Sequence, residues 1–228
     1  MWRRLKSCLP DLSGVNVVVT AGGTREPIDP IRFLGNRSSG KMGNAFAAAA
    51  LEAGASVTLI TAASPPLKSP QMKVVQVETA DEMAAAVQVA LSPGSVLVMA
   101  AAVADYKPAS VASEKIKKTG TATSLELVPT IDILVTVGHS EMRDQLFIVG
   151  FAAETENLLE NAQKKIATKR LDLCVVNDVS SPDVGMGADE NAVTICDRAG
   201  LVAEFGRAPK GEIATAIIGL VAARLASR

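Results

Sequence analysis

Short apolar runs recur along the chain and alternate with segments rich in helix-forming residues. The apolar runs predict buried strands at residues 15–19, 56–60, 73–77, 95–100, 146–151 and 173–176. The intervening segments predict helices at residues 41–53, 79–91, 131–138 and 156–170. Apolar strands alternating with helices are typical of an α/β fold: a doubly wound, Rossmann-like, mostly parallel sheet with helices on both faces. Such a sheet binds its ligands at the carboxyl ends of its strands.

The two ends of the domain are indicated by a loss of this pattern. Residues 1–14 have no clear periodicity and predict a lead-in or linker, which leaves residues 15–228 as one domain. Residues 179–191 are rich in glycine and acids and predict a long loop at a strand end. A calcium loop is the alternative there, but the EF-hand spacing is absent.

Three other segments depart from the alternation. Residues 24–35 contain Pro27 and Pro30 and predict an irregular loop. Residues 114–121 combine charges with turn formers, which predicts a mobile flap. A small strand extension and a closing helix are expected at residues 124–128, 192–196 and 210–228.

Composition narrows the class of protein. Of 228 residues, 48% are hydrophobic but only 3% aromatic, so the core must consist of aliphatic side chains, as in parallel sheets covered by helices. Lys and Arg total 23 against 24 Asp and Glu, which argues against a basic surface for nucleic acid. No run of residues approaches a membrane span. The three cysteines are widely spaced without a CxxC pair, which favours neither disulfides nor zinc and predicts a cytoplasmic protein.

The strongest chemical signal is a pair of small-residue motifs after the first strand. Residues 21–24 read AGGT, and residues 36–43 read NRSSGKMG and open an alanine-rich helix. Small residues leave backbone N–H groups accessible, and a helix start offers unpaired donors with a partial positive charge, so we expect a phosphate site. The spacing fits neither GxGxxG nor GxxxxGK[ST], and a packing role for the strand–turn–helix unit remains the alternative.

Two further positions carry candidate chemistry. Asp105 follows the strand at 95–100 through a run of small residues, where it either contacts a ligand or caps a helix. Lys165 and Lys169 share one helix face at i, i+4. Such lysines are usually solvated, but their mutual repulsion would also favour an anion between them.

Taken together, the motifs resemble one family. They read TAGGTREPIDPIR, NRSSGKMG, AAVADYKP, EKIKK, GFAAET, ND and GADENAVT, in that order along residues 11–226. This set resembles phosphopantothenoylcysteine synthetase of the bacterial type, the C-terminal half of the bifunctional coenzyme A biosynthesis flavoprotein. The resemblance implies a ligase that joins 4′-phosphopantothenate to L-cysteine. It implies CTP as co-substrate, an acyl-cytidylate intermediate, and release of pyrophosphate and CMP.

The resemblance also assigns roles to individual residues. Asn36 matches the residue that binds the acyl intermediate, and Lys115 matches a flap lysine of the second step. Ala101 and Ala102 match contacts to the pantothenate arm. Arg32 matches an arginine that reaches the substrate phosphate of a neighbouring subunit, which implies a homodimer with shared sites.

The nucleotide contacts that the resemblance implies form a larger set. They are Gly22, Ser38, Gly40, Gly43, Asp105, Ile131, Asp132, Ile133, Leu134, Phe151, Lys165, Lys169 and Asn177. The family commonly has Pro-Asp-Ile-Leu where this chain has Ile131 to Leu134, so the start of that helix is expected to differ. Mg²⁺ is expected to bridge the nucleotide phosphates without a dedicated set of protein ligands.

Other functions are weighed by what the sequence lacks. An NAD(P)-dependent Rossmann-type reductase would share the phosphate site, but the only tyrosine, Tyr106, has Ser110 rather than lysine four residues on. A non-catalytic nucleotide-binding module would leave Asn36 and Lys115 without a role. The flavin-dependent decarboxylase half is missing from the sequence, which fits a stand-alone ligase and a piece of a bifunctional protein equally well.

Overall fold

The computed structural model of the chain describes residues 11–64, 69–154, 157–178 and 187–228. Several predictions concern residues outside these ranges: most of the lead-in at 1–14, the first residue of the helix expected from 156, and the greater part of the loop at 179–191. The segment between the strands expected at 56–60 and 73–77 is described at both of its ends but not in its middle.

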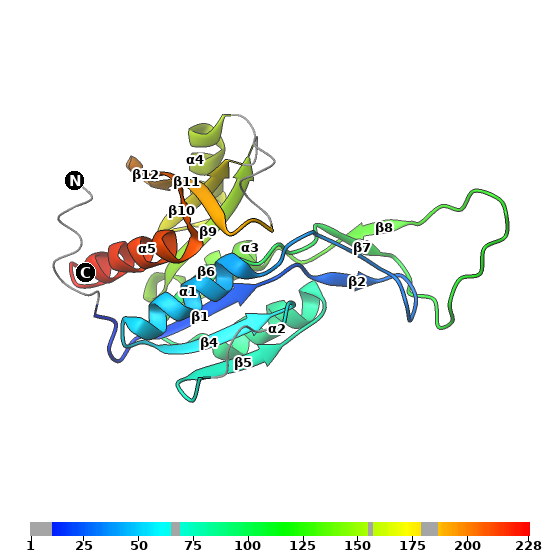
Figure 1. Cartoon of the computed structure of the whole chain (residues 1–228), viewed down its shortest axis with the longest axis horizontal. Helices are drawn as coiled ribbons and strands as arrows, with labels where there is room; N and C mark the ends of the chain where they lie inside the picture. Colours follow the sequence, from blue (N-terminus) through cyan, green and yellow to red (C-terminus); the bar gives the residue numbers. More distant parts are fainter. Residues whose placement is uncertain (1–10, 65–68, 155–156, 179–186) are drawn as a thin grey trace.

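An eight-stranded sheet forms the centre of the molecule (Figure 1), with the strand order β12-β11-β10-β9-β6-β1-β4-β5. The strands from β10 to β5 in this order are parallel, which confirms the predicted doubly wound α/β fold. Each predicted strand is present within a few residues of its expected bounds. The parallel strands are β1 (Asn16–Ala21), β4 (Ser56–Thr61), β5 (Met72–Gln76), β6 (Val96–Met99), β9 (Phe147–Glu154) and β10 (Leu173–Asp178).

Two antiparallel strands extend the sheet beyond β10. The strand β11 (Glu190–Asp197) includes the predicted run, and β12 (Gly200–Pro209) follows it through a tight turn. The sequence reading missed β12. It lies at the sheet edge, where most of its residues are partly or fully exposed, and so it lacks the apolar run that marks a buried strand.

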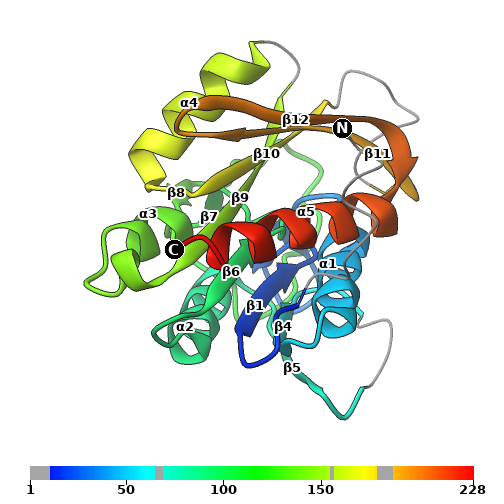
Figure 2. The same ribbon diagram turned by 90° about the vertical axis from the view of Figure 1, so that its left-hand side faces the viewer.

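Helices cover both faces of the sheet, as predicted (Figure 2). One hydrophobic core lies between the sheet and the helices α1 and α5, and a second lies between the opposite face and α2, α3 and α4. Aliphatic side chains dominate both cores, as the composition requires. The helices are α1 (Lys41–Glu52), α2 (Ala80–Ala90), α3 (Ile133–Gly138), α4 (Leu158–Lys169) and α5 (Lys210–Leu225), with a 3₁₀ turn η2 (Arg143–Gln145).

Local signals fix several helix ends. A capping box precedes α2: the hydroxyl of Thr79 accepts from the N–H of Glu82 at 3.2 Å, and the Glu82 carboxylate accepts from the N–H of Thr79 at 3.4 Å. After α1, Gly54 adopts a left-handed φ of 84°, the conformation expected of a glycine that ends a helix.

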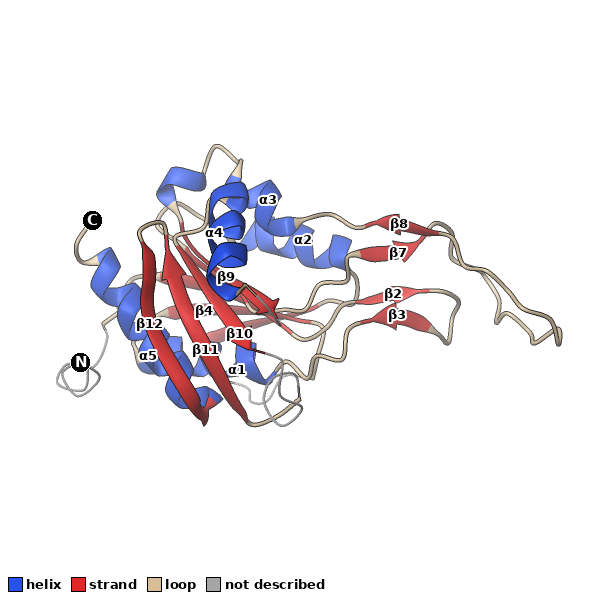
Figure 3. Cartoon of the chain, turned by 90° about the horizontal axis from the view of Figure 1, so that it is seen from above, coloured by secondary structure: helices blue, strands red, loops and turns tan. Residues whose placement is uncertain are grey.

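Two short hairpins form an arm that projects from the body (Figure 3). Strands β2 (Arg25–Pro27) and β3 (Phe33–Gly35) pair with each other, as do β7 (Tyr106–Pro108) and β8 (Leu127–Pro129), and β2 contacts β7. The prediction that residues 24–35 are irregular was therefore wrong. Pro27 is the last residue of β2, a strand-end position at which a missing N–H does little harm. The strand expected at 124–128 is shorter and begins later, at Leu127.

The segment predicted to be a flap connects β7 to β8 at the far end of the arm (Figure 1). Its residues from 113 to 127 are exposed. The N–H of Ala112 donates to the carbonyl of Ile28 at 3.0 Å and so ties the flap to the turn between β2 and β3. The flap and the first hairpin therefore form one unit at the tip of the arm.

Candidate active site

A cleft opens where the strand order of the sheet changes direction. The chain leaves β1 towards β4 and β5 on one side, and leaves β6 towards β9 and β10 on the other. Beyond these neighbouring strands, the N–H of Ala102 donates to the carbonyl of Gly22 at 2.8 Å. The cleft has a volume of about 490 Å³ and lies at the strand ends, where a doubly wound sheet binds its ligands.

Most of the predicted site residues line this cleft. They come from the start of α1, the residues after β6, the start of α3, the ends of β9 and β10, and one face of α4. They are Asn36, Ser38, Gly40, Ala101, Ala102, Asp105, Ile131, Asp132, Ile133, Leu134, Phe151, Lys165, Lys169 and Asn177.

The start of α1 is built to receive an anion. Gly40 precedes the helix with a φ of 78°, and no side chain caps the helix start. A Cβ atom at Gly40 would lie 3.0 Å from the Cβ of Ala63 and 3.2 Å from the backbone nitrogen of Gly22, so the close approach of these segments requires glycine at position 40. The N–H groups of the first turn therefore remain available to a phosphate.

Gly22 and Gly43 do not line the cleft. A Cβ at Gly22, where φ is 83°, would lie 2.6 Å from the nitrogen of Ala63. A Cβ at Gly43 would lie 2.6 Å from the Cβ of Ala21 and 2.7 Å from the carbonyl oxygen of Thr20, both in β1. Gly43 therefore allows α1 to pack closely on the strand, and it acts on the anion site through the position of the helix.

Four lysines line the cleft: the predicted Lys165 and Lys169 from α4, and Lys41 and Lys210 from the starts of α1 and α5. Lys169 forms an ion pair with Asp132 at 2.7 Å. Asp132 also caps α3, since its carboxylate accepts from the N–H of Val135 at 3.0 Å. Burial raises the pKa of Asp132, but the hydrogen bonds from Lys169 and Val135 outweigh it, and the pKa is lowered overall.

Sequence reasoning missed Lys41 and Lys210. Lys41 pairs with Asp189 at 2.6 Å and donates to the carbonyl of Gly187 at 3.1 Å, and Lys210 is buried and donates to the carbonyl of Ala188. Burial lowers the pKa of Lys210, and the nearby charge of Lys41 lowers it further. A signal was available, because each lysine is the first residue of a helix, where the dipole disfavours a cation unless an anion is present.

Asn36 extends from the segment before α1 towards the residues after β6. Its Nδ2 donates to the carbonyls of Ala102 and Val103 at 3.3 and 3.2 Å. Both hydrogen bonds are long and lie at an exposed position, so a stronger acceptor on a ligand can replace them. The predicted donation to an acyl oxygen therefore requires exchange of these two partners.

Asp105 does not cap a helix, because the strand β7 begins at the next residue; that alternative was wrong. Its carbonyl accepts from the N–H of Thr130 at 3.0 Å, and the residue lines the cleft. On the opposite wall, Asn177 accepts a hydrogen bond through its Oδ1 from the Nδ2 of Asn191 at 2.9 Å. Asn191 is buried, and the sequence reading did not select it.

An aromatic wall closes the same end of the cleft. The half-buried ring of Phe151 packs edge-on against Phe46 of α1, with ring centroids 5.5 Å apart and planes at 82°. Because this contact fixes the ring, Phe151 offers a rigid apolar surface beside Asn177. The pair can hold a flat polar ring such as a nucleobase.

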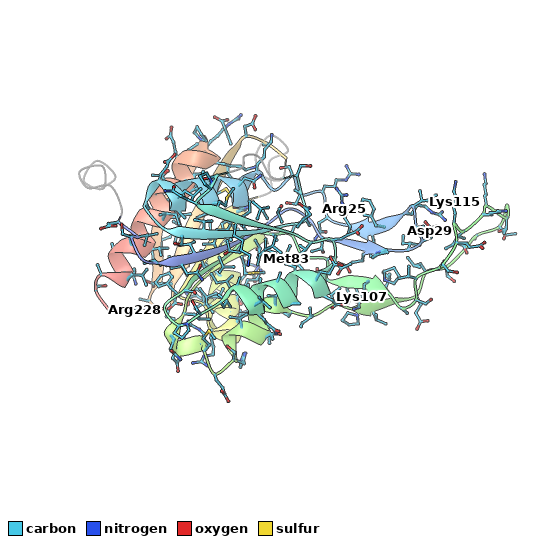
Figure 4. All side chains as sticks on the ribbon, turned by 90° about the horizontal axis from the view of Figure 1, so that it is seen from below. Arg25, Asp29, Met83, Lys107, Lys115 and Arg228 are labelled. Atoms are coloured by element: carbon cyan, nitrogen blue, oxygen red, sulfur yellow. The ribbon has the colours of Figure 1, made fainter. Side chains whose placement is uncertain are left out.

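Arg32 and Lys115 lie outside the cleft, on the arm. Figure 4 shows Lys115 at the arm's far end, near Asp29. Lys115 is exposed, and Arg32 pairs with Asp29. A role for Lys115 in this chain's own cleft therefore requires movement of the flap, and a role for Arg32 requires a second copy of the chain.

In the described ranges, no cluster of three or more His, Cys, Asp or Glu side chains could hold a metal ion. Asp105 is the cleft carboxylate that has no ion pair within those ranges, since Asp132 is paired with Lys169. A Mg²⁺ ion in this cleft would therefore depend mainly on ligand phosphates. None of the helices described has both the length and the apolar character needed to cross a bilayer.

Comparison with known proteins gives a consistent result. Residues 12–225 match the family described as DNA/pantothenate metabolism flavoprotein C-terminal domain. The chain is 46% identical over 187 residues to the coenzyme A biosynthesis bifunctional protein CoaBC of Escherichia coli K12, covering 80% of this chain and 46% of that protein. For CoaBC of Bacillus subtilis the identity is 42% over 216 residues, covering 93% and 52%. The chain thus spans about half the length of these relatives.

Solved structures agree. The crystal structure of the C-terminal domain of a CoaBC protein superposes with a TM-score of 0.78 at 39% identity, covering 95% of this chain and 98% of that one. A Cab2 mutant in complex with phosphopantothenate-cysteine superposes with a TM-score of 0.73 at 18% identity, covering 93% and 88%. The second likeness is one of fold.

Proposed function

Because the chain belongs to the DNA/pantothenate metabolism flavoprotein C-terminal domain family, we propose that it is a CTP-dependent phosphopantothenate–cysteine ligase. Such an enzyme makes 4′-phosphopantothenoylcysteine for coenzyme A biosynthesis. The observation that carries the proposal is the cleft itself. It combines a helix start open to phosphate, four lysines, a rigid aromatic wall and an asparagine amide beside small residues.

The first step activates the carboxylate of 4′-phosphopantothenate, which is a poor electrophile at neutral pH. One carboxylate oxygen attacks the α-phosphorus of CTP, the bond to the β-phosphate oxygen breaks, and pyrophosphate leaves. The start of α1 and the four cleft lysines supply positive charge where the triphosphate carries negative charge. Asp105 lines the cleft and would help to hold Mg²⁺, which would supply further positive charge to the phosphates.

The second step forms the amide. The cysteine amine attacks the acyl carbon, CMP leaves with the electrons of the acyl–oxygen bond, and the amine loses one proton. Asn36 would donate to the developing oxyanion in place of the Ala102 and Val103 carbonyls. Lys115 would reach the mixed anhydride when the flap closes and excludes water.

The end of the cleft near Phe151 and Asn177 would bind the base of the nucleotide. Phe151 offers its ring to the base, and Asn177 offers polar atoms beside it. The start of α3 provides the opposite wall, where Ile131 and Asp132 stand close to Lys169. The preference for CTP over ATP is part of the proposal because the chain resembles the bacterial type of the family and is similar to the bacterial CoaBC proteins.

A homodimer with shared sites is supported by the arm. Large apolar side chains gather there in exposed positions, which in a monomer would face water. They are Ile31, Phe33, Tyr106, Val111, Ile116, Leu125 and Leu127. A second copy would cover them and would bring Arg32 within reach of the substrate phosphate. We place the enzyme in the cytoplasm, where its substrates are made.

The test is pyrophosphate release from the purified protein with 4′-phosphopantothenate and Mg²⁺, comparing CTP with ATP, each with and without cysteine. We expect release with CTP, and CMP and amide only when cysteine is added. Asn36→Asp should abolish turnover, since a carboxylate would face the Ala102 and Val103 carbonyls and the acyl group. No release with either nucleotide from a folded protein that binds CTP would favour a binding module instead.

A further inference from the structure

Asp29 is a buried carboxylate on an otherwise exposed arm. Its side chain is 0% exposed, although Ile31 and Phe33 beside it face solvent. The carboxylate accepts five hydrogen bonds. A carboxylate removed from water in this way is stable only if hydrogen-bond donors surround it, and the five donors around Asp29 meet this requirement.

The two oxygens of Asp29 have different partners. Oδ1 accepts from the backbone N–H groups of Ile31 and Arg32, both at 2.9 Å, and so closes the turn between β2 and β3. Oδ2 accepts from Nε and Nη2 of Arg32 and from the N–H of Ile116, the last at 3.2 Å. The first oxygen therefore forms the turn, and the second joins the turn to the flap.

Arg32 completes the connection. Its Nη2 also donates to the carbonyl of Ile116 at 2.9 Å, so both backbone groups of Ile116 are bound by the Asp29–Arg32 pair. Ile116 directly follows Lys115 in the flap. The pair thus sets where the flap lysine starts before any movement towards the cleft.

The base of the arm is fixed to the body by hydrogen bonds and an ion pair, so the turn that holds the flap is itself held in place. The N–H of Arg25 donates to the carbonyl of Glu78 at 2.8 Å. The buried carboxylate of Glu26 accepts from the N–H of Ala80 at 3.0 Å, at the start of α2. Lys107 of the second hairpin pairs with Asp81 of the same helix. Figure 4 shows Lys107 at the base of the arm and Asp29 and Lys115 towards its tip.

One side of Arg32 remains open. Its side chain is 49% exposed, and within the described ranges its Nη1 makes no hydrogen bond. An arginine held through Nε and Nη2 presents Nη1 in a fixed direction, which suits a phosphate oxygen. The hydrogen bond from Arg32 also lowers the pKa of Asp29 well below its usual range, so the carboxylate is ionised at neutral pH.

We propose that Asp29 is a positioning residue for the ligase reaction: through Oδ2 it aims Arg32 at the substrate phosphate and holds the flap beside Lys115 in its starting position. The inference rests on the proposed function for its catalytic half. Its structural half, the connection between turn and flap, does not depend on it.

The informative substitution is Asp29→Asn. The backbone N–H groups of Ile31 and Arg32 keep the amide oxygen at the Oδ1 position, so the amide nitrogen replaces Oδ2 and faces other donors. The turn is retained and the connection to Ile116 is lost. Asp81→Asn is the matched control, because it removes the α2 carboxylate that pairs with Lys107 at the base of the arm and leaves the contacts of the flap unchanged.

Limited proteolysis with trypsin measures how firmly the flap is held to the β2–β3 turn, and it requires no assay of activity. The flap contains Lys115, Lys117 and Lys118, all exposed, and cleavage there requires local opening. Loss of a hydrogen bond to a charged group should raise the open population and speed cleavage about tenfold in Asp29→Asn. Asp81→Asn should be cut at the wild-type rate. Equal flap cleavage in wild type and Asp29→Asn would overturn the proposal.

Two variants at Ile116 test the same hydrogen bond without changing the buried Asp29, whose substitution could disturb folding. Ile116→Pro removes the N–H that donates to Asp29, whereas Ile116→Ala keeps it, and both change an exposed side chain. Because trypsin does not cleave after Lys115 when proline follows, the readout is cleavage after Lys117 and Lys118, which we expect to be faster in the proline variant only. The same rate in both variants would contradict the role of this hydrogen bond.

The catalytic half is tested with the half-reactions. Asp29→Asn should raise the KM for 4′-phosphopantothenate about tenfold through Arg32, and should slow cysteine-dependent CMP release more than pyrophosphate release. A uniform loss of both half-reactions at unchanged KM would indicate a merely structural residue and overturn this half. Absence of pyrophosphate release from the wild type would refute the proposed function, while the proteolysis result would still decide the connection.

Discussion

Replacement of Gly43 by alanine tests the idea that close packing of α1 on β1 sets the anion site. The added Cβ would lie 2.6 Å from the Cβ of Ala21 and 2.7 Å from the carbonyl oxygen of Thr20. Ordinary carbon contacts are ~3.5–4.0 Å, so the helix must move away from the strand by about 1 Å. Both neighbours belong to the central strand of the sheet and cannot easily give way.

The magnitude follows from two opposing contributions. Overpacking of this kind costs ~1–3 kcal/mol, whereas alanine in place of glycine within a helix stabilises by about 1 kcal/mol. Gly219→Ala isolates the second contribution, because Gly219 lies within α5 and a Cβ there meets no atom within 4 Å. The difference between the two variants is therefore the packing cost, ~2 kcal/mol, or about 4–8 °C in Tm for a chain of this length.

Scanning calorimetry of both variants without ligand measures this difference, and titration with CTP measures its effect on binding. Gly43→Ala should melt below Gly219→Ala and should bind CTP more weakly, because the start of α1 moves with the helix. Two variants that melt together would refute the packing argument. A lower Tm with unchanged affinity for CTP would separate the position of the helix from the anion site.

Three further predictions concern single groups. Lys115→Gln should still release pyrophosphate but accumulate acyl-cytidylate, detected by mass spectrometry of quenched reactions; equal loss of pyrophosphate release would assign Lys115 to the first step. The pKa of Asp132 is lowered, so its pair with Lys169 stabilises the fold above the unfolded pKa of ~3.9, and this stabilisation is lost as the pH falls through the folded pKa. Asp132→Asn should therefore lower Tm at pH 7 by more than at pH 3, and a difference independent of pH would contradict the assignment. Cys174 and Cys196 are buried, and burial raises the pKa of Cys196, so neither should react with iodoacetamide at pH 8 before unfolding; rapid labelling of either thiol in the folded protein would contradict this.

The sequence predicts the parallel strands and the helices because burial on both faces leaves an uninterrupted apolar run. The edge strand β12 is not predicted, because most of its residues are partly or fully exposed and it therefore lacks such an apolar run. The arm is predicted only in part, at β8, because its four strands are three residues long and three of them contain a proline, and because they are stabilised by the turn at Asp29 and by contacts with residues distant in sequence. Local propensity carries little information about such contacts.

The candidate site divides in a similar way. Positions in small-residue motifs at strand ends, such as Ser38 and Ala102, could be predicted because the topology brings those ends together. Asn191 lies in the GADENAVT motif and Lys210 begins a helix, but neither position by itself indicates the cleft, since both residues reach it only through the pairing of β10 with β11 and the packing of α5. The separation of Lys115 from the cleft is a matter of conformation, which residue identity does not specify.

The cleft lies on the seam between the half of the sheet that ends in β5 and the half that ends in β12. A nucleotide bound there would contact α1 on one side and α4 on the other, so its binding free energy would also oppose separation of the two halves. By linkage, free ligand at 100 times its Kd would add about 2.7 kcal/mol to the free energy of unfolding. Melting curves with CTP, CMP and pyrophosphate would then distinguish a ligand that spans the seam from two fragments that each occupy one side, because only in the intact nucleotide are the parts that contact the two halves linked by covalent bonds.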